Sequence, residues 1–416
     1  MSHISFPIII LASVFILISI RQIGNIKFEI WQIMLLGAIA VLLAKSIHPE
    51  TALKSIDINV LLFLFGMFVI GVALEESGYM SHISYILFKD AASIDSLLLR
   101  ILFFMGFASA LLMNDTLAII GTPLMLLLAK KHSINPKLLL LALAFSVTTG
   151  SVMSPIGNPQ NLLIAINSNL PDPFIAFLKH LFLPTIINMS AIYFVLKVLY
   201  RDEFRTKKLK HIYEPIKDTK LAILSKYSLI LVVLLVVLKI IISLLHSGFD
   251  FSLTYIAIIG SLPILIFSEK RFEIVRNIDW HTIIFFASMF VLMKSVWLTG
   301  FFQHFLNNYD GNISSTTYVM IISIVLSQFI SNVPMVALYI PVLMHTGATP
   351  KSMIALAIGS TIAGNLLILG AASNIIIIQN AEKRSKETIS FLEFAKAGIP
   401  ITIINAIVYW FFLNIV

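Results

Sequence analysis

The chain has 416 residues, of which 58% are hydrophobic and only 12% are charged, with a formal net charge of +8. A soluble protein of this length cannot hide so much apolar surface, so the composition excludes that class and indicates a protein whose solvent is the lipid bilayer. The positive charge does not indicate a nucleic-acid partner, because the basic residues lie in loops between apolar blocks. The absence of cysteine excludes disulfides and thiolate metal sites.

The apolar residues gather in blocks of about 17 to 25 residues, the length with which an α-helix crosses about 30 Å of hydrocarbon. A β-barrel would instead show segments of about ten alternating residues. The first block is followed, and not preceded, by a basic residue, Arg21, so we interpret it as a retained span rather than a cleavable signal. Ten full spans are predicted near residues 5–20, 28–46, 57–76, 137–167, 174–200, 227–246, 251–268, 280–298, 351–381 and 393–415.

Two further apolar stretches, 98–131 and 316–347, are too long for one span, and each carries polar residues at its middle. We interpret both as re-entrant hairpins that enter and leave the membrane on the same side. A polar tip inside the membrane is tolerated where protein or water surrounds it. The predicted fold class is therefore an all-α polytopic membrane protein with about ten transmembrane helices and two re-entrant helical hairpins.

The basic residues predict the orientation. Cytoplasmic loops collect Lys and Arg, and the loop 201–226 contains eight of them. Two more basic connections lie at 270–276 and 383–386, whereas three connections contain no Lys or Arg: 168–173, 247–250 and 299–315. We therefore expect the loop 201–226 in the cytoplasm and both termini outside the cell membrane. Lys45 and Lys54 do not fit this pattern.

The two halves of the chain resemble each other. Residues 56–78 align with 278–300, and the matches continue in the same order through Asn114 with Asn332, Pro123 with Pro341, Gly157 with Gly370 and Asn161 with Asn374. We predict a first repeat over 1–200, a solvated linker over 201–226 and a second repeat over 227–416. Each half holds five spans and one hairpin, and this odd number of crossings inverts the second repeat. Inverted repeats with interrupted helices are typical of secondary transporters.

The first candidate site is a helix break within 150–161, inside the span 137–167. Two prolines remove backbone donors there, and Gly157 allows dihedral angles that a helix forbids, so backbone groups become available to a ligand. Three side-chain amides add donors and acceptors: Asn158, Gln160 and Asn161. The alternative is a kink whose free groups are satisfied by neighbouring helices and water.

The second candidate site is the corresponding stretch 364–374 in the span 351–381. It has no proline, so a break would depend on Gly370 and the small residues that follow, and Ser373 and Asn374 would supply polar groups. The alternative is close helix packing, which small residues also mediate.

The hairpin tips carry the remaining candidates, which are Asn114, Asp115 and Thr116 in the first and Ser331 and Asn332 in the second. Helix N-termini at such tips present open amides and a partial positive charge to an anion. Asp115 is the one acid in its hairpin core and has Val333 as its repeat counterpart. A carboxylate can bind sodium or exchange a proton, so Asp115 is the candidate coupling residue; the alternative is a helix N-cap.

These motifs resemble the ion transporter superfamily, in particular the group that joins arsenite efflux permeases, NhaD-type sodium/proton antiporters and divalent anion/sodium symporters. The resemblance rests on NDT at 114–116, GNPQN at 157–161, SNVP at 331–334 and AGNLLILGAASN at 363–374. It implies that the tips and breaks together bind substrate and ion while a hairpin-bearing region moves against a scaffold. The implied ligands are Asn114, Asp115, Thr116, Gly157, Asn158, Asn161, Asn332, Gly370, Ser373 and Asn374.

The sequence therefore predicts a secondary active transporter that moves a small anion, oxyanion or metalloid across the cell membrane, coupled to a sodium or proton gradient. Sodium/proton antiport is the main alternative. Di- or tricarboxylate symport is disfavoured, because the Ser-Asn-Thr signatures of dicarboxylate symporters are absent from the tips and breaks.

An enzyme is not expected, since the sequence has no HExxH motif, no G-x-S-x-G elbow and no Walker A motif. The expected ligands are a small ion or polar solute and lipid. No cofactor is expected except a sodium ion, near Asp115, Asn161 and Asn374. A homodimer and a separate cytoplasmic ATPase subunit stay open as partners.

Overall fold

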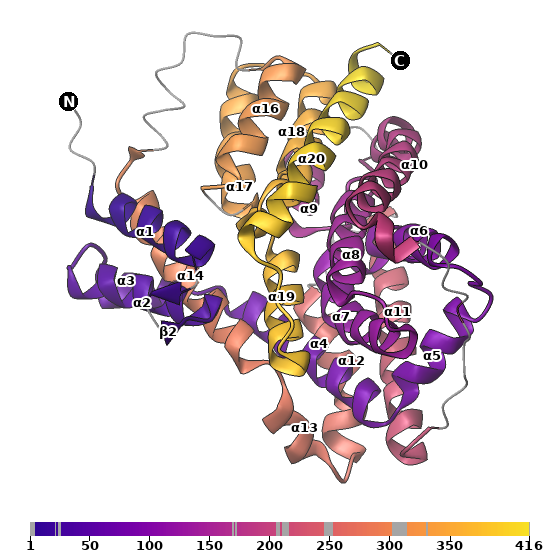
Figure 1. Ribbon diagram of the computed structural model, residues 1–416. Coiled ribbons are helices and arrows are strands. Elements are labelled where there is room, and N and C mark those ends of the chain that lie inside the picture. Colours follow the sequence, from indigo (N-terminus) through magenta and orange to yellow (C-terminus); the bar gives the residue numbers. More distant parts are fainter. Residues whose placement is uncertain are drawn as a thin grey trace.

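The computed structural model describes residues 5–20, 22–23, 26–168, 170, 173–204, 209, 216–244, 253–301, 314–329 and 332–415. Within these ranges the regular secondary structure is helical apart from one antiparallel pair of two-residue strands, β1 (Gln22–Ile23) and β2 (Ile26–Lys27). Figure 1 shows the C-terminus at one end of the molecule and α13 (Arg271–Asn277) at the other. We call these the C-terminal end and the linker end, because the linker residues Lys217 and Asp218 contact Ser77 and Lys270 there.

Helices occupy all ten predicted spans. They are α1 (Phe6–Ile20), α2 (Ile30–Leu43), α4 (Ile58–Glu76), α8 (Pro136–Ser151) with α9 (Pro159–Asn167), α10 (Pro173–Leu199), α11 (Thr219–Leu244), α12 (Leu253–Phe267), α14 (Trp280–Trp297), α18 (Pro350–Leu366) with α19 (Ala372–Ser385), and α20 (Phe391–Asn414). Among the described residues, six helices are long and apolar enough to cross a membrane: α4, α6 (Ile94–Leu112), α10, α11, α14 and α20. The other helices in the predicted spans have 9 to 17 residues. Two of the predicted spans are each divided between two helices.

The first hairpin consists of α6 and α7 (Asn114–His132). Its two open ends both lie beside the start of the linker. Asp95 at the start of α6 forms an ion pair with Lys197 at 2.5 Å. Asn135, just after α7, donates its backbone N–H to Glu203 at 3.4 Å. The chain therefore enters and leaves this hairpin at the same end.

The second hairpin, α16 (Thr316–Leu326) and α17 (Asn332–His345), opens the opposite way. The Thr316 hydroxyl donates to Asn414 at 2.5 Å, next to the C-terminus. Ser352, in the first turn of α18, donates to the carbonyl of Ser314 at 2.6 Å. Since the two hairpins open to opposite ends, the prediction of inverted repeats is confirmed.

Equivalent residues have equivalent backbone roles in the two repeats. Asp57 and Asp279 are the N-caps of α4 and α14, and their carboxylates accept hydrogen bonds from the amides of the first turn. Gly78 and Gly300 follow the same helices with positive φ angles of 76° and 71°, a conformation that glycine adopts without steric cost.

Some helices lie where the sequence predicted connections. They are α3 (Pro49–Ser55), α5 (Tyr79–Phe88), α13 and the short 3-10 helix η1 (Arg201–Phe204). In addition, α11 begins at Thr219, within the segment predicted as linker. Asp218 accepts a hydrogen bond from the backbone N–H of Leu221 at 3.0 Å. This bond, together with the ion pair to Lys270, lowers the pKa of Asp218 and keeps the carboxylate charged where it precedes the helix.

The repeats exchange helices around a central body. Helix α14 of the second repeat packs on α1 and α2 of the first, and α4 of the first repeat packs on α11 and α12 of the second. We call these groups the first and second outer bundles. Gly66 makes the second bundle close, because a Cβ there would lie 2.6 Å from the carbonyl oxygen of Ala257. The hairpins, the broken helices, α10 and α20 form the central body (Figure 1).

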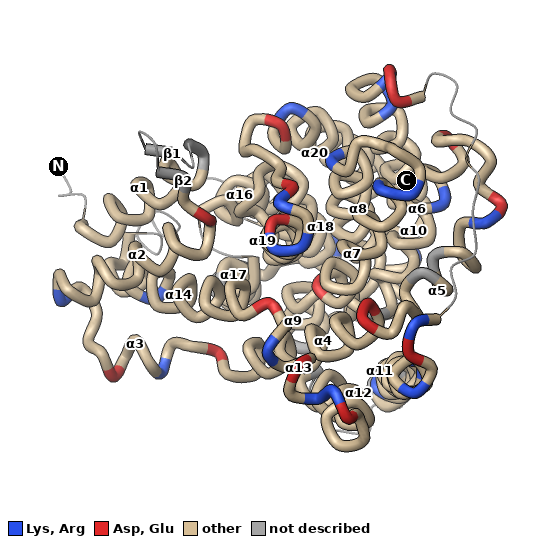
Figure 2. Tube along the Cα trace, turned by 60° about the horizontal axis from the view of Figure 1, so that its bottom comes forward, with Lys and Arg blue, Asp and Glu red and all other residues tan. Residues whose placement is uncertain are grey.

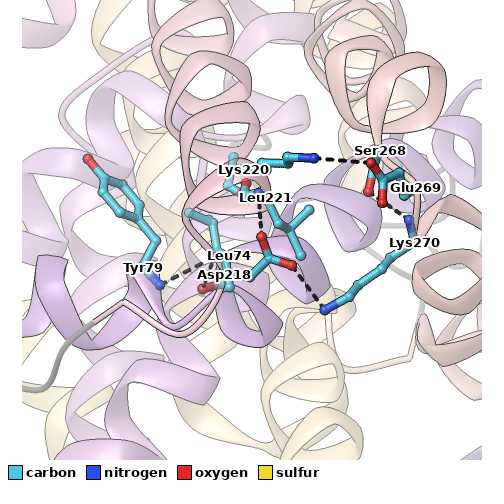
Figure 3. Close-up of polar contacts among 10 residues, drawn as sticks. Leu74, Tyr79, Asp218, Lys220, Leu221, Ser268, Glu269 and Lys270 are labelled. Carbon is cyan, nitrogen blue, oxygen red and sulfur yellow. Dashed lines mark hydrogen bonds and ion pairs between the residues drawn. The ribbon is translucent and has the colours of Figure 1, made fainter.

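The three predicted basic connections meet at the linker end. Lys270 pairs with Asp218 at 3.0 Å, and Lys383 donates to the carbonyl of Asn277 at 2.7 Å. Figure 2 shows charged residues around α13, the start of α11 and the end of α19. Figure 3 shows Asp218 between Leu221 and Lys270, with Lys220 beside Glu269. This clustering is the pattern expected of a cytoplasmic face.

The positions of the two ends predict opposite chemical accessibility. Because the chain has no cysteine, Lys386→Cys at the linker end and Thr346→Cys at the C-terminal end are single reporters, and both side chains are exposed. In intact cells, a membrane-impermeant maleimide should label Thr346→Cys, whereas Lys386→Cys should react only after permeabilisation. Labelling of Lys386→Cys from outside would reverse the proposed orientation.

Candidate functional site

The first helix break lies between α8 and α9 and is held by its own asparagines. Asn158 is the N-cap of α9, and its Oδ1 accepts a hydrogen bond from the backbone N–H of Asn161 at 2.8 Å. Asn161 in turn donates through Nδ2 to the carbonyls of Ser151 at 3.1 Å and Ser154 at 3.0 Å. The side chain of Asn161 thus gives a further donor to the carbonyls of Ser151, at the end of α8, and of Ser154, in the segment that follows it.

The second break has the same construction with fewer bonds. Between α18 and α19 the chain forms a short 3-10 helix, η2 (Ile368–Gly370). Asn374 Nδ2 donates to the carbonyl of Gly364 at 2.6 Å. Asn161 and Asn374 therefore both reach ten residues back to the end of the preceding half-helix. The Asn374 Oδ1 and the Ser373 hydroxyl are buried without a hydrogen-bond partner among the described residues.

Glycine is needed at both breaks for a reason other than the one predicted. Gly157 has no positive φ angle, so the expectation of a special backbone conformation is wrong. A Cβ at Gly157 would lie 2.3 Å from the carbonyl oxygen of Ser151, and one at Gly370 would lie 2.3 Å from that of Ala363. Each glycine allows the connecting segment to cross directly over the preceding half-helix.

Each hairpin tip is fastened to the break of its own repeat. The backbone N–H of Asn114 donates to the carbonyl of Gly157 at 2.9 Å. In the second repeat, Gln328 Nε2 donates to the carbonyl of Ala363 at 2.9 Å. The sequence analysis missed Gln328, which lies one turn before the predicted tip. Ser331 lies outside the described residues, and Asn332 is buried at the start of α17.

Two small cavities occupy equivalent positions between the tips and the outer bundles. The first has a volume of about 10 Å³ and the second about 30 Å³, enough for a water or a small ion. Their linings pair across the repeats: Phe63 with Phe285, Met67 with Met289, and Ile156 with Leu369. Met113 and Thr116 of the first tip line the first cavity, and Gln328 lines the second.

The first cavity also contains a lysine that the sequence analysis missed. Lys239 of α11 is 7% exposed and lines this cavity together with Met113 and Thr116. Ile18 occupies the corresponding turn of α1, because Leu11 and Phe15 line the second cavity where Val232 and Val236 line the first. The signal in the sequence was one cation within a long apolar run.

Asp115 lies on the same tip but does not cap its helix. The residue preceding α7 is Met113, with a φ of 69° and no side-chain cap, so the N-cap interpretation of Asp115 is wrong. The carboxylate Oδ1 is buried and accepts no hydrogen bond from the described residues. Asp115 and Lys239 thus place ionisable groups at the first tip, whereas Val333 and Ile18 hold the matching places in the second repeat.

The predicted site residues come together in two groups. Thr361 of α18 accepts a hydrogen bond from Asn158 Nδ2 and donates to Asn161 Oδ1, both at 3.2 Å, which joins the first break to the second repeat. Gln160 is buried beside them. Ser373 and Asn374 form the other group, and no hydrogen bond between described residues connects the two. No three His, Asp or Glu residues gather as a metal site in the described part of the chain, so a sodium ion at Asp115 would need amide, hydroxyl or carbonyl oxygens as its further ligands.

Comparisons with known proteins find relatives that match most of the chain. A family model described as a citrate transporter, CitMHS, matches residues 14–352. The silicon efflux transporter LSI3 of Oryza sativa subsp. japonica is 26% identical, over 89% of this chain and 89% of its own. The 46 kDa membrane protein of Mycobacterium leprae is also 26% identical, over 89% of this chain and 90% of its own.

Two further relatives differ more in length or sequence. The P protein of Mus musculus is 24% identical over 89% of this chain, which spans 56% of that protein. Among solved structures, the Alcanivorax borkumensis YdaH transporter has a TM-score of 0.47 and 14% identity, with 98% of this chain and 97% of that one covered. Since the family model covers most of the sequence, the chain belongs to the CitMHS family and is a multi-pass membrane transporter.

Proposed function

We propose that the protein is a secondary active transporter that moves a small anion, oxyanion or metalloid across the cell membrane, coupled to a sodium or proton gradient. The observation that carries this proposal is the position of Lys239. Its side chain lines the same cavity as Met113 and Thr116, which flank the N-terminus of α7. An ammonium group beside the positive end of a helix dipole favours a negatively charged ligand.

The size and charge of the cavity favour a small substrate. The first cavity holds about 10 Å³ and has one cationic side chain, whereas a tricarboxylate needs several cations and far more room. One relative is named a silicon efflux transporter, which supports a compact oxygen-containing solute. The family description as a citrate transporter supports the di- or tricarboxylate alternative, which we rank below it.

Coupling is assigned to Asp115. A carboxylate oxygen that is buried and receives no hydrogen bond among the described residues is costly unless a cation or proton neutralises it. The same observation favours the second candidate function, sodium/proton antiport, in which Asp115 would itself carry the exchanged ion. Proteoliposomes with separate sodium, proton and anion gradients distinguish the two, because only the first function needs an anion for flux.

We further propose that the linker end faces the cytoplasm, that both termini lie outside and that the protein resides in the cell membrane. The clustering of basic residues at the linker end supports this orientation.

Lys239→Met should reduce anion uptake about tenfold to a hundredfold, because a hydrogen bond to a charged group contributes about 1.5–3 kcal/mol. Ile18→Met, at the equivalent turn of the first outer bundle, is the matched control and should keep uptake near the wild-type rate. Initial rates in proteoliposomes provide the measurement. Equal losses in the two variants would indicate a packing defect and remove Lys239 from the substrate site.

Asp115→Asn keeps the size of the side chain but removes its charge. It should abolish gradient-driven accumulation while leaving substrate exchange between the two sides, because the coupling ion loses its ligand. Uptake and counterflow across a pH series, with and without sodium, test this expectation. Unchanged ion dependence in the variant would exclude Asp115 from coupling.

Asn161→Ala and Asn374→Ala should both abolish uptake, with different effects on stability. The first removes the side-chain donor to the carbonyls of Ser151 and Ser154, whereas the second removes only the donor to that of Gly364, and each lost hydrogen bond costs about 0.5–1.5 kcal/mol. Thermal unfolding of the purified variants should show the larger loss for Asn161→Ala. Wild-type uptake by a well-folded Asn374→Ala variant would make the second break a purely structural element.

A further inference from the structure

A large cavity with a charged lining opens at the linker end. It has a volume of about 640 Å³ and lies between the ends of α4, α7 and α19 and the last residues of the linker. Its lining includes five charged residues: Glu75, Lys130, Lys217, Arg384 and Glu387. We call it the vestibule. It shares no lining residue with the two small cavities at the hairpin tips.

The cations of the vestibule fall into two kinds. Lys130 and Lys217 are exposed at its rim, and neither ammonium has an ion-pair partner among the described residues. Arg384 lies deeper, with 18% of its side chain exposed, and forms an ion pair with Glu75 of α4. The lining therefore offers two cations at the entrance and one whose anionic partner belongs to another helix.

Arg384 is connected to the first hairpin through a short polar chain. Its Nε donates to Asn380 Oδ1, and Asn380 Nδ2 donates to the carbonyl of Ile119 at 3.4 Å. That carbonyl lacks its normal helical donor, because Pro123 of α7 has no N–H. Ile119 lies one turn from Asp115, so the base of the vestibule reaches the helix that carries the coupling residue.

We propose that the vestibule is a binding site for a small oxyanion, held by Lys130, Lys217 and Arg384. The further claim that substrate binds here first when it enters from the linker end rests on the proposed function. Anion binding to the vestibule does not depend on that function. An oxyanion accepts several charge-assisted hydrogen bonds, and guanidinium and ammonium groups are the donors that suit it. Glu75 acts as a competitor, since it neutralises Arg384 while the vestibule is empty.

Because Glu75 and the anion compete for Arg384, anion binding should change the contact between two parts of the protein. The Glu75–Arg384 pair joins α4 of the second outer bundle to α19 of the central body. When an anion replaces the Glu75 carboxylate, this connection is lost and the two parts are freed from each other at the linker end. A partly exposed ion pair contributes little to stability, so the contacts of a bound oxyanion readily offset its loss.

The test is phosphate binding to the purified full chain in nanodiscs of neutral lipid, at constant ionic strength, followed by isothermal titration and thermal unfolding. Wild-type protein should bind inorganic phosphate saturably. The double variant Lys130→Gln/Lys217→Gln should bind at least tenfold more weakly. Lys220→Gln is the matched control, because this exposed lysine lies at the same end but pairs with Glu269 at 3.3 Å outside the vestibule (Figure 3).

The Glu75→Gln variant distinguishes a specific anion site from general electrostatic attraction and from a folding defect. It removes the competitor, so phosphate should bind several-fold more tightly than to wild type. Weaker or unchanged binding in Glu75→Gln, or equal losses in the double variant and Lys220→Gln, would overturn the proposal. The source of the anion is tested by adding anionic lipid to the nanodiscs. Phosphate binding in neutral lipid would identify the ligand as a soluble oxyanion. Protection from unfolding by anionic lipid alone would identify the ligand as a lipid headgroup. The absence of both effects would refute the site.

Measurements of transport kinetics test anion binding to the vestibule separately from the proposed transport function. If the double variant has a raised KM for uptake from the linker end and an unchanged maximal rate, the vestibule loads the substrate. If the wild-type protein transports no anion yet binds phosphate through Lys130 and Lys217, the site stands and the transport proposal fails. If uptake proceeds in the double variant with a wild-type KM, the vestibule is not a loading station.

Discussion

The need to satisfy backbone groups inside hydrocarbon governs this structure. Two helices stop within the membrane, and each exposes carbonyls that water would satisfy at a protein surface. Asn161 and Asn374 donate to these carbonyls from ten residues further along the chain. The hairpin tips then attach to the same breaks through Asn114 and Gln328. The positions of the described tip and break residues follow from these attachments, because tip and break lie together in each repeat.

Much of the fold could be predicted because membrane helices leave a strong signal. Apolar length located the spans, and the odd number of crossings in each half predicted the inversion that the two oppositely opening hairpins confirm. Prolines, glycines and asparagines located the breaks. The reason for Gly157 could not be read from sequence, since the steric conflict is with Ser151, whose carbonyl approaches only after the helix has stopped.

The rest of the candidate site depends on contacts between distant segments. In the sequence, Lys239 is only a single cation within an apolar helix. The structure shows its importance, because it brings α11 beside the tip formed by Met113 and Thr116. Thr361 is similarly inconspicuous, yet it bonds both asparagines of the other repeat. Comparison of equivalent positions in the two repeats identifies such residues, because the repeat without the polar side chain shows which residue type suffices for packing at that position. Ile18 and Val333 are the apolar counterparts of Lys239 and Asp115.

The exchange of helices between repeats has a consequence for biosynthesis. Helix α4 leaves the ribosome long before α11 and α12, its partners in the second outer bundle, have been made. During that interval its buried face, which includes Gly66, lies against lipid or an insertion chaperone rather than protein. The first half is thus not an autonomous folding unit, and a chain truncated after the linker should be recognised by membrane quality control as an orphan subunit.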